Sequence, residues 1–228
     1  MTDYIVATIK PWNIDAYHRN AGNLSTRGNW HLVTSPESLQ EILLAVKPRY
    51  IFFPHWSWKV PDEITRRYEC ICFHMTDVPY GRGGSPLQNL ILRGHTSTKL
   101  SALRMVDELD AGPVYDKAEL SLAGDAQGIY EDMAQKVYAM IADIVTNEPE
   151  PNEQQGEVVT FERRTEEQSV LPESASLKEL FDHIRMLDAE TYPRAFVQYG
   201  DYKLEFAQAA LVNDELRCSV TISKGGKQ

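Results

Sequence analysis

Short apolar runs alternate with helix-like segments over the first half of the chain. Near-continuous apolar runs are typical of strands covered on both faces, and four such runs lie at residues 4–9, 30–34, 50–54 and 70–75. Between the second and third runs, Ser35 can cap a helix that begins at Pro36. A short helix is predicted to open at Pro61. This β-α-β-α-β order predicts a Rossmann-like, doubly wound α/β fold with a mostly parallel sheet.

After residue 146 the pattern changes from long apolar elements to a polar loop, followed by a helix and strands of alternating polarity. Before it, the pattern predicts a Gly-rich loop at 78–84, a helix after it, a strand at 99–106 and a long helix at 126–146. The polar, proline-containing stretch that follows predicts a loop. An amphipathic helix at 177–187 and alternating strands at 203–206 and 216–222 then predict a small α+β unit. We therefore predict a catalytic domain at 1–150, a linker at 151–174 and a C-terminal unit at 175–228 with a frayed tail at 224–228.

Composition narrows the class of protein. The 228 residues are 43% hydrophobic and 25% charged, which excludes disorder over the whole chain and provides a sizeable core. No apolar run approaches the roughly 18 residues of a membrane helix, and no signal peptide is evident. Three cysteines, an odd number, predict reduced thiols in a cytoplasmic protein with no membrane partner.

The charge balance argues against a nucleic-acid partner. The chain carries 23 basic and 33 acidic residues, a net charge of −10. Proteins that bind a phosphate backbone usually show a basic stripe, and the basic clusters here are no longer than Arg66-Arg67 and Arg163-Arg164. We therefore expect no nucleic acid as the main partner.

Polar residues that follow strand ends are the candidates for chemistry, because open α/β sheets bind ligands at the carboxyl ends of their strands. They lie at residues 10–13, 55–58, 74–77 and 110–113. His55, His74 and Asp110 would form an acid/base set if they converged on one edge. For each of them a hydrogen-bonded structural role also stays open.

Two other interpretations of this region are weaker. Cys70, Cys72 and His74 would share one face of a strand, but zinc ligands usually have a turn between them and no second Cys/His pair is evident. Buried thiols and no metal are therefore predicted. The Gly81–Gly84 loop lacks the Gly-Lys-Ser/Thr ending of a phosphate-binding P-loop, so its glycines are read as permitting a tight turn.

The region from 69 to 115 resembles the formyltransferases that use N10-formyltetrahydrofolate. Their shared pattern is a strand that ends in Asn-x-His, a loop Leu-Pro-x-x-Arg-Gly, a helix and a later Leu-Asp-x-Gly-Pro. His74, the loop at 79–83 and Asp110 match this pattern. The resemblance covers most of 50–145 and is weaker at 184–196. Residues 10–13 and 155–164 are more similar to the sugar N-formyltransferases.

The resemblance implies a function and a set of site residues. The chain would transfer a formyl group from N10-formyltetrahydrofolate to the amine of a nucleotide-linked amino sugar, for a surface glycan such as lipopolysaccharide O-antigen. His74 would stabilise the oxyanion or take the amine proton, and Asp110 would orient it. The folate would contact Trp56, Ser57, Trp58, Leu109 and Asp110; the acceptor would contact Lys10, Trp12, Asn13, Tyr80 and Arg82. A homodimer is also implied.

One departure from the family pattern leaves alternatives open. The family's asparagine, two residues before the histidine, is Cys72 here, and a thiol is a weak donor. His55 is the first candidate to replace it as a catalytic group, ahead of Ser57 and Asn89. The alternatives are formylation of methionyl-tRNA and a non-catalytic folate- or nucleotide-binding module.

Overall fold

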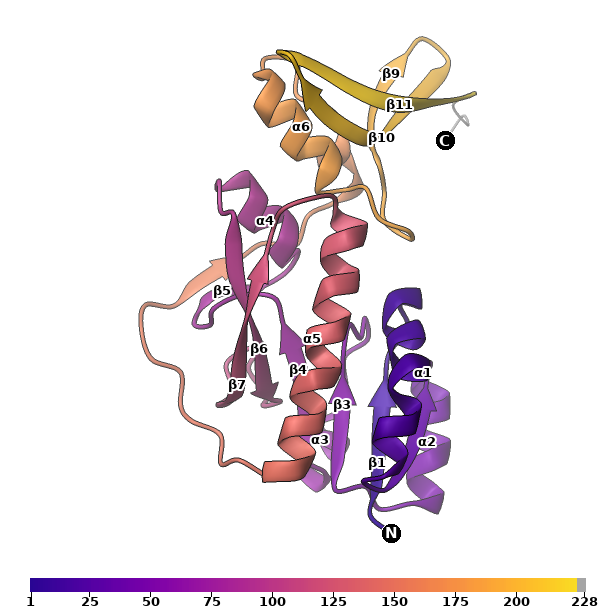
Figure 1. The fold of residues 1–228 in the computed structure, drawn as a ribbon, viewed down its shortest axis with the longest axis vertical. Helices are drawn as coiled ribbons and strands as arrows, with labels where there is room; N and C mark the ends of the chain where they lie inside the picture. The colour runs from indigo at the N-terminus through magenta and orange to yellow at the C-terminus, as the bar shows by residue number, and fades with distance from the viewer. Residues whose placement is uncertain (225–228) are drawn as a thin grey trace. The chain divides into compact units, whose positions relative to one another are not determined.

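The main sheet has six strands in the order β2-β1-β3-β4-β6-β7 (Figure 1). The computed structural model describes residues 1–224, so the predicted frayed tail lies, apart from Lys224, outside the described residues. The strands are β1 Asp3–Ala7, β2 Asn29–Val33, β3 Tyr50–Phe53, β4 Cys70–His74, β6 Ser97–Arg104 and β7 Val114–Ser121. The first four pair in parallel and β6 runs antiparallel to β4. The predicted mostly parallel sheet is therefore confirmed.

Helices cover both faces of this sheet. Leu39 of α2 (Pro36–Ala45) and Ile64 of α3 (Asp62–Arg67) pack in one core cluster with Ile51. The second pair, α1 (Pro11–Ser25) and α5 (Ala126–Asn147), is joined where Tyr138 Oη donates to the carbonyl of Asn13 at 3.0 Å. This is the doubly wound α/β arrangement that the sequence predicts.

Local signals explain where these helices begin. The Ser35 hydroxyl accepts from the Ser38 amide at 3.1 Å, so the predicted cap of α2 is confirmed. Helix α1 also starts with a proline, Pro11. The sequence analysis did not predict α1, because its apolar residues are too few to form a clear stripe at helical spacing.

The segment after β4 is more regular than the sequence indicates. The Gly-rich loop contains strand β5 (Tyr80–Gly83), which pairs with β8 (Val159–Phe161) in a two-stranded sheet. Gly81 and Gly83 have φ values of 80° and 104°, a backbone conformation that favours glycine. Helix α4 (Pro86–Leu92) follows, as predicted.

The C-terminal part is a small α+β unit, as predicted. Helix α6 (Leu177–Arg185) begins at a capping box formed by Ser176 and Glu179. The strands β9 (Ala195–Tyr199), β10 (Tyr202–Val212) and β11 (Glu215–Lys224) form an antiparallel sheet in the order β11-β10-β9. A short 3-10 helix, Glu166–Ser169, precedes α6.

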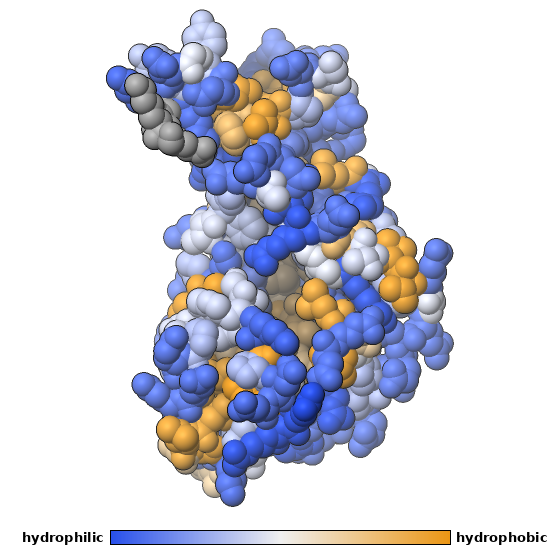
Figure 2. All heavy atoms as spheres, turned by 180° about the vertical axis from the view of Figure 1, so that it is seen from behind, coloured by the Kyte–Doolittle hydropathy of each residue, from blue (hydrophilic) through white to orange (hydrophobic). Residues whose placement is uncertain are grey.

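The described chain divides into two compact units that do not follow its sequence order. One unit comprises 1–83, 98–120 and 131–160. The described part of the other comprises 84–97, 121–130 and 161–224. The division into a catalytic domain at 1–150, a linker at 151–174 and a C-terminal unit at 175–228 stays a prediction. The face shown in Figure 2 is mostly hydrophilic, with apolar residues in separate groups. Within residues 1–224, none of the helices combines the length and the apolar character that crossing a membrane requires.

Candidate active site

His74 stands at the carboxyl end of β4 and is 8% exposed. Its Nε2 lies 2.7 Å from the carbonyl oxygen of Gly81. A carbonyl can only accept, so Nε2 is the donor in this hydrogen bond. Nδ1 lies 3.5 Å from Oδ2 of Asp110. The ring is thus oriented by β5 through one nitrogen and faces a carboxylate with the other.

Asp110 reaches His74 from the loop after β6. Its Oδ2 accepts a hydrogen bond from the Gly83 amide at 2.9 Å. The residue has φ +54°, a left-handed conformation that aspartate tolerates better than most residues but that still stores strain. The structure therefore brings together two members of the predicted acid/base set, at the carboxyl edge of the sheet.

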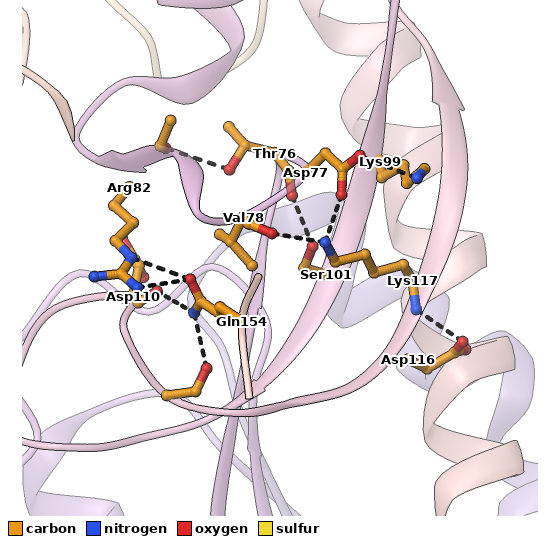
Figure 3. A network of polar contacts seen from close by, with 12 residues as sticks. Thr76, Asp77, Val78, Arg82, Lys99, Ser101, Asp110, Asp116, Lys117 and Gln154 are labelled. Atoms are coloured by element: carbon orange, nitrogen blue, oxygen red, sulfur yellow. Dashed lines mark hydrogen bonds and ion pairs between the residues drawn. The ribbon is translucent and has the colours of Figure 1, made fainter. Parts of the chain in front are cut away.

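A glutamine that the sequence did not single out ties the Asp110 loop to β5 (Figure 3). Gln154 Nε2 donates to the carbonyls of Asp110 and Gly112, both at 2.8 Å. Its Oε1 accepts from Arg82 Nε at 3.1 Å and Nη2 at 2.8 Å. Arg82 Nη1 also contacts Glu108 at 3.1 Å, and the Arg82 side chain is 14% exposed. Arg82, predicted to contact the acceptor, is thus engaged inside the protein.

A second polar group holds the turn between β4 and β5 (Figure 3). Asp77 pairs with Lys117 Nζ at 2.5 Å and with Lys99 Nζ at 3.0 Å. Lys117 Nζ also donates to the carbonyl of Val78 at 2.7 Å. Burial alone would raise the pKa of Asp77, but the hydrogen bonds from the two lysines outweigh it and lower that pKa.

His55 lies just after β3 and packs against Trp12, which follows β1. Its ring makes an edge contact with Trp12, with centroids 5.4 Å apart, and Lys10 Nζ lies 5.6 Å from the Trp12 ring centroid. Burial, and secondarily the charge of Lys10, lowers the pKa of His55 to about 3. This lowered pKa favours the neutral imidazole of His55 near pH 7. Asn13 is fully buried in the first turn of α1.

The predicted folate contacts lie on the loops after β3 and β6. Trp56 packs against Phe53, with ring centroids 5.8 Å apart, and against Trp58 at 5.0 Å. Trp58 is 46% exposed and Leu109 is 70% exposed. Ser57 is exposed and Tyr80 is half-buried at the start of β5. Their roles as ligand contacts stay predictions.

Cys72 lies two residues before His74 on β4. Burial, reinforced by the negative charge of Asp110, raises the pKa of its thiol. The thiol is therefore protonated near pH 7, which does not suit a nucleophile or a metal ligand. Nowhere in the described part of the chain do three or more His, Cys, Asp or Glu side chains gather as a metal site would require.

A buried His–Asp pair at the carboxyl edge of a doubly wound sheet is an arrangement typical of α/β enzymes that use acid–base chemistry. Residues 166–223 match the family model of the methionyl-tRNA formyltransferase C-terminal domain. A solved methionyl-tRNA formyltransferase from Clostridium thermocellum is 41% identical, covers 99% of this chain and 100% of its own, and superposes with a TM-score of 0.95. The chain belongs to the formyltransferase family.

Two further relatives mark the limits of this likeness. The methionyl-tRNA formyltransferase of Sulfurihydrogenibium sp. is 28% identical over 199 residues, which cover 81% of this chain and 63% of the relative. The chain thus spans slightly less than two thirds of that relative's length. A sugar N-formyltransferase from a Shewanella species is 14% identical, with a TM-score of 0.72 over 91% of this chain and 97% of its own. At that identity it shares the fold alone.

Proposed function

We propose that this protein transfers a formyl group from N10-formyltetrahydrofolate to the amine of methionyl-tRNA. The observation that carries the transfer chemistry is the His74–Asp110 pair, held by Gly81 and Gly83. The tRNA acceptor is supported by the full-length likeness to the Clostridium thermocellum enzyme. The amino-sugar acceptor expected from the sequence has weaker support, because the Shewanella sugar N-formyltransferase shares only 14% identity. The tRNA proposal also departs from the expectation, based on the net charge of −10, that nucleic acid is not the main partner.

The site residues can support each step of the transfer. The acceptor amine forms a bond to the formyl carbon, and the bond from that carbon to N10 breaks. The amine loses a proton and N10 gains one, which yields the formamide and tetrahydrofolate. His74 takes the amine proton on Nδ1, where the Asp110 carboxylate stabilises the resulting imidazolium. Holding both substrates beside this pair supplies much of the rate.

The donor pocket is proposed at the loops after β3 and β6. Trp58 and Leu109 expose apolar surface there, which a bound pterin ring would remove from water. Titration with 5-formyltetrahydrofolate, a stable donor analogue, followed by tryptophan fluorescence tests this placement. We expect saturable binding that weakens in Trp58→Ala. Binding of equal affinity in wild type and variant would place the donor elsewhere.

The acceptor is decided by a direct competition. The protein is incubated with N10-formyltetrahydrofolate and methionyl-tRNA, or with a panel of nucleotide-linked amino sugars, and the gain of one formyl group is followed by mass spectrometry. Asp110→Asn is the control, with strongly reduced transfer expected. Formylation of an amino sugar alone would overturn the tRNA proposal. Folate binding without any transfer would favour the non-catalytic module.

The homodimer implied by the resemblance is kept as a proposal. Strand β11 is an edge of its sheet and carries Ile222, which is 64% exposed. Long edge strands with exposed apolar residues are available for pairing with another chain. Sedimentation velocity is expected to show a dimer for wild type and a monomer for Ile222→Lys. A monomeric wild type would contradict the proposal.

A further inference from the structure

We propose that Gln154 is a positioning residue for the His74–Asp110 pair. This inference rests on the proposed function, because it assigns a role in that same reaction. Gln154 acts through the main chain of the Asp110 loop and touches neither reacting group with its own side chain in the contacts described above. Its position in the chain is 44 residues after Asp110, between α5 and β8.

Both the nitrogen and the oxygen of the Gln154 carboxamide form hydrogen bonds. Its two N–H groups donate to the carbonyls at each side of Ala111, those of Asp110 and Gly112. Its oxygen accepts two hydrogen bonds from Arg82. Because Arg82 can only donate and the carbonyls can only accept, these partners fix which end of the amide faces the loop. Figure 3 shows the Gln154 carboxamide facing both Arg82 and Asp110.

The loop that Gln154 holds has little room to adjust. A Cβ added at Gly112 would lie 1.8 Å from the carbonyl oxygen of Arg104, so the loop lies directly against β6. At its other end Asp110 adopts φ +54°, a conformation that persists only where the surroundings enforce it. The hydrogen bonds from Gln154 supply that enforcement at the main chain.

Strand β5 connects the two sides of this arrangement. Arg82 holds Gln154, the next residue, Gly83, donates to the Asp110 carboxylate, and the carbonyl of Gly81 accepts from His74. Three consecutive residues of β5 therefore contact the His74 imidazole, the Gln154 carboxamide and the Asp110 carboxylate. Loss of the Gln154 amide would let Asp110 rotate away from Nδ1 of His74, which lies at 3.5 Å.

Three variants separate this role from a merely structural one. Gln154→Glu keeps an acceptor for Arg82 but cannot donate to the two loop carbonyls. Gln154→Leu removes both sets of contacts. Gln155→Leu changes the exposed neighbour and is the matched control. We expect kcat for formyl transfer to fall about 10- to 100-fold in both Gln154 variants, with KM for both substrates within about twofold of wild type.

A second readout does not depend on turnover. The imidazole ¹⁵N signals of His74 are assigned by their loss in His74→Gln, and we expect the Gln154 variants to shift them toward their positions in Asp110→Asn. Unshifted signals together with wild-type kcat, or equal losses in Gln155→Leu, would overturn the inference. A wild type without formyl transfer would refute the proposed function, and the ¹⁵N signals would then decide the positioning role alone.

Discussion

Replacing Lys117 by methionine tests how the turn before β5 is held. Methionine keeps the length and apolar stem of the side chain but removes the ammonium group. The change leaves Asp77 with its second partner, Lys99, at 3.0 Å. It also removes the donor that lies 2.7 Å from the carbonyl of Val78, a residue that is buried. Lys99→Met removes one ion pair from the same carboxylate and is the matched control.

The expected loss of unfolding free energy depends on which hydrogen bonds and ion pairs each lysine forms. A buried carbonyl that loses its hydrogen bond costs about 1–3 kcal/mol. The ion pair with Asp77 adds little, because both partners are partly exposed and water screens such pairs. We therefore expect Lys117→Met to lose about 1–3 kcal/mol of unfolding free energy, with Tm lower by about 2–4 °C per kcal/mol. Lys99→Met should lose clearly less.

Thermal and urea unfolding at pH 7, followed by circular dichroism and tryptophan fluorescence, measure these losses. The kcat of formyl transfer is measured on the folded proteins, because the turn leads to Gly81, whose carbonyl orients His74. We expect kcat to fall in Lys117→Met and to stay near wild type in Lys99→Met. Equal destabilisation by the two substitutions would refute the reasoning, since it would mean that the Val78 carbonyl does not depend on Lys117.

Substitutions at Glu69, Gly112 and Cys72 test three other features of the protein. Burial would raise the pKa of Glu69, but hydrogen bonds from Tyr115 and Arg49 outweigh it and hold that pKa below the ordinary 4.5. Ionised Glu69 therefore stabilises the fold above the ordinary pKa of 4.5 and loses this effect as the pH falls through its lowered pKa. The urea midpoints of wild type and Glu69→Gln should therefore converge as the pH falls below about 4.5. Gly112→Ala should lose about 1–3 kcal/mol or more, measured by urea unfolding, and an unchanged midpoint would contradict the close packing. Cys72→Asn should raise kcat by about 10-fold or more, because a carboxamide is a better donor than a thiol; an unchanged kcat would show that this position does not polarise the formyl oxygen.

Local signals explain what the sequence predicted well. Continuous apolar runs marked β1, β2, β3 and β4, and the Ser35-Pro36 pair marked the start of α2. The alternation at 216–222 marked the antiparallel strand β11. These features depend on neighbouring residues alone. The contact between His74 and Asp110 could be predicted only because the spacing of the two residues matches a family pattern.

Long-range polar contacts explain what the sequence missed. Gln154 lies in a stretch whose prolines and polar residues predict only a loop, and nothing nearby indicates that it clamps a loop 44 residues away. Lys117 likewise holds Asp77 from 40 residues further along the chain. The neutral state of His55 follows from its packing against Trp12 and its nearness to Lys10. None of these partners can be identified from local periodicity.

The route of the chain has a consequence for where this protein can be shortened. A protein cut at residue 150 would keep β1, β3, β4 and β6, with His74 and Asp110 at their ends. It would lack Gln154 and the strand β8 that pairs with β5. During synthesis, too, Asp110 is made before its partner, because Gln154 lies 44 residues further along the chain. The hydrogen bonds from Gln154 to the Asp110 loop can therefore form only after the long helix α5 (Figure 1) has been synthesised.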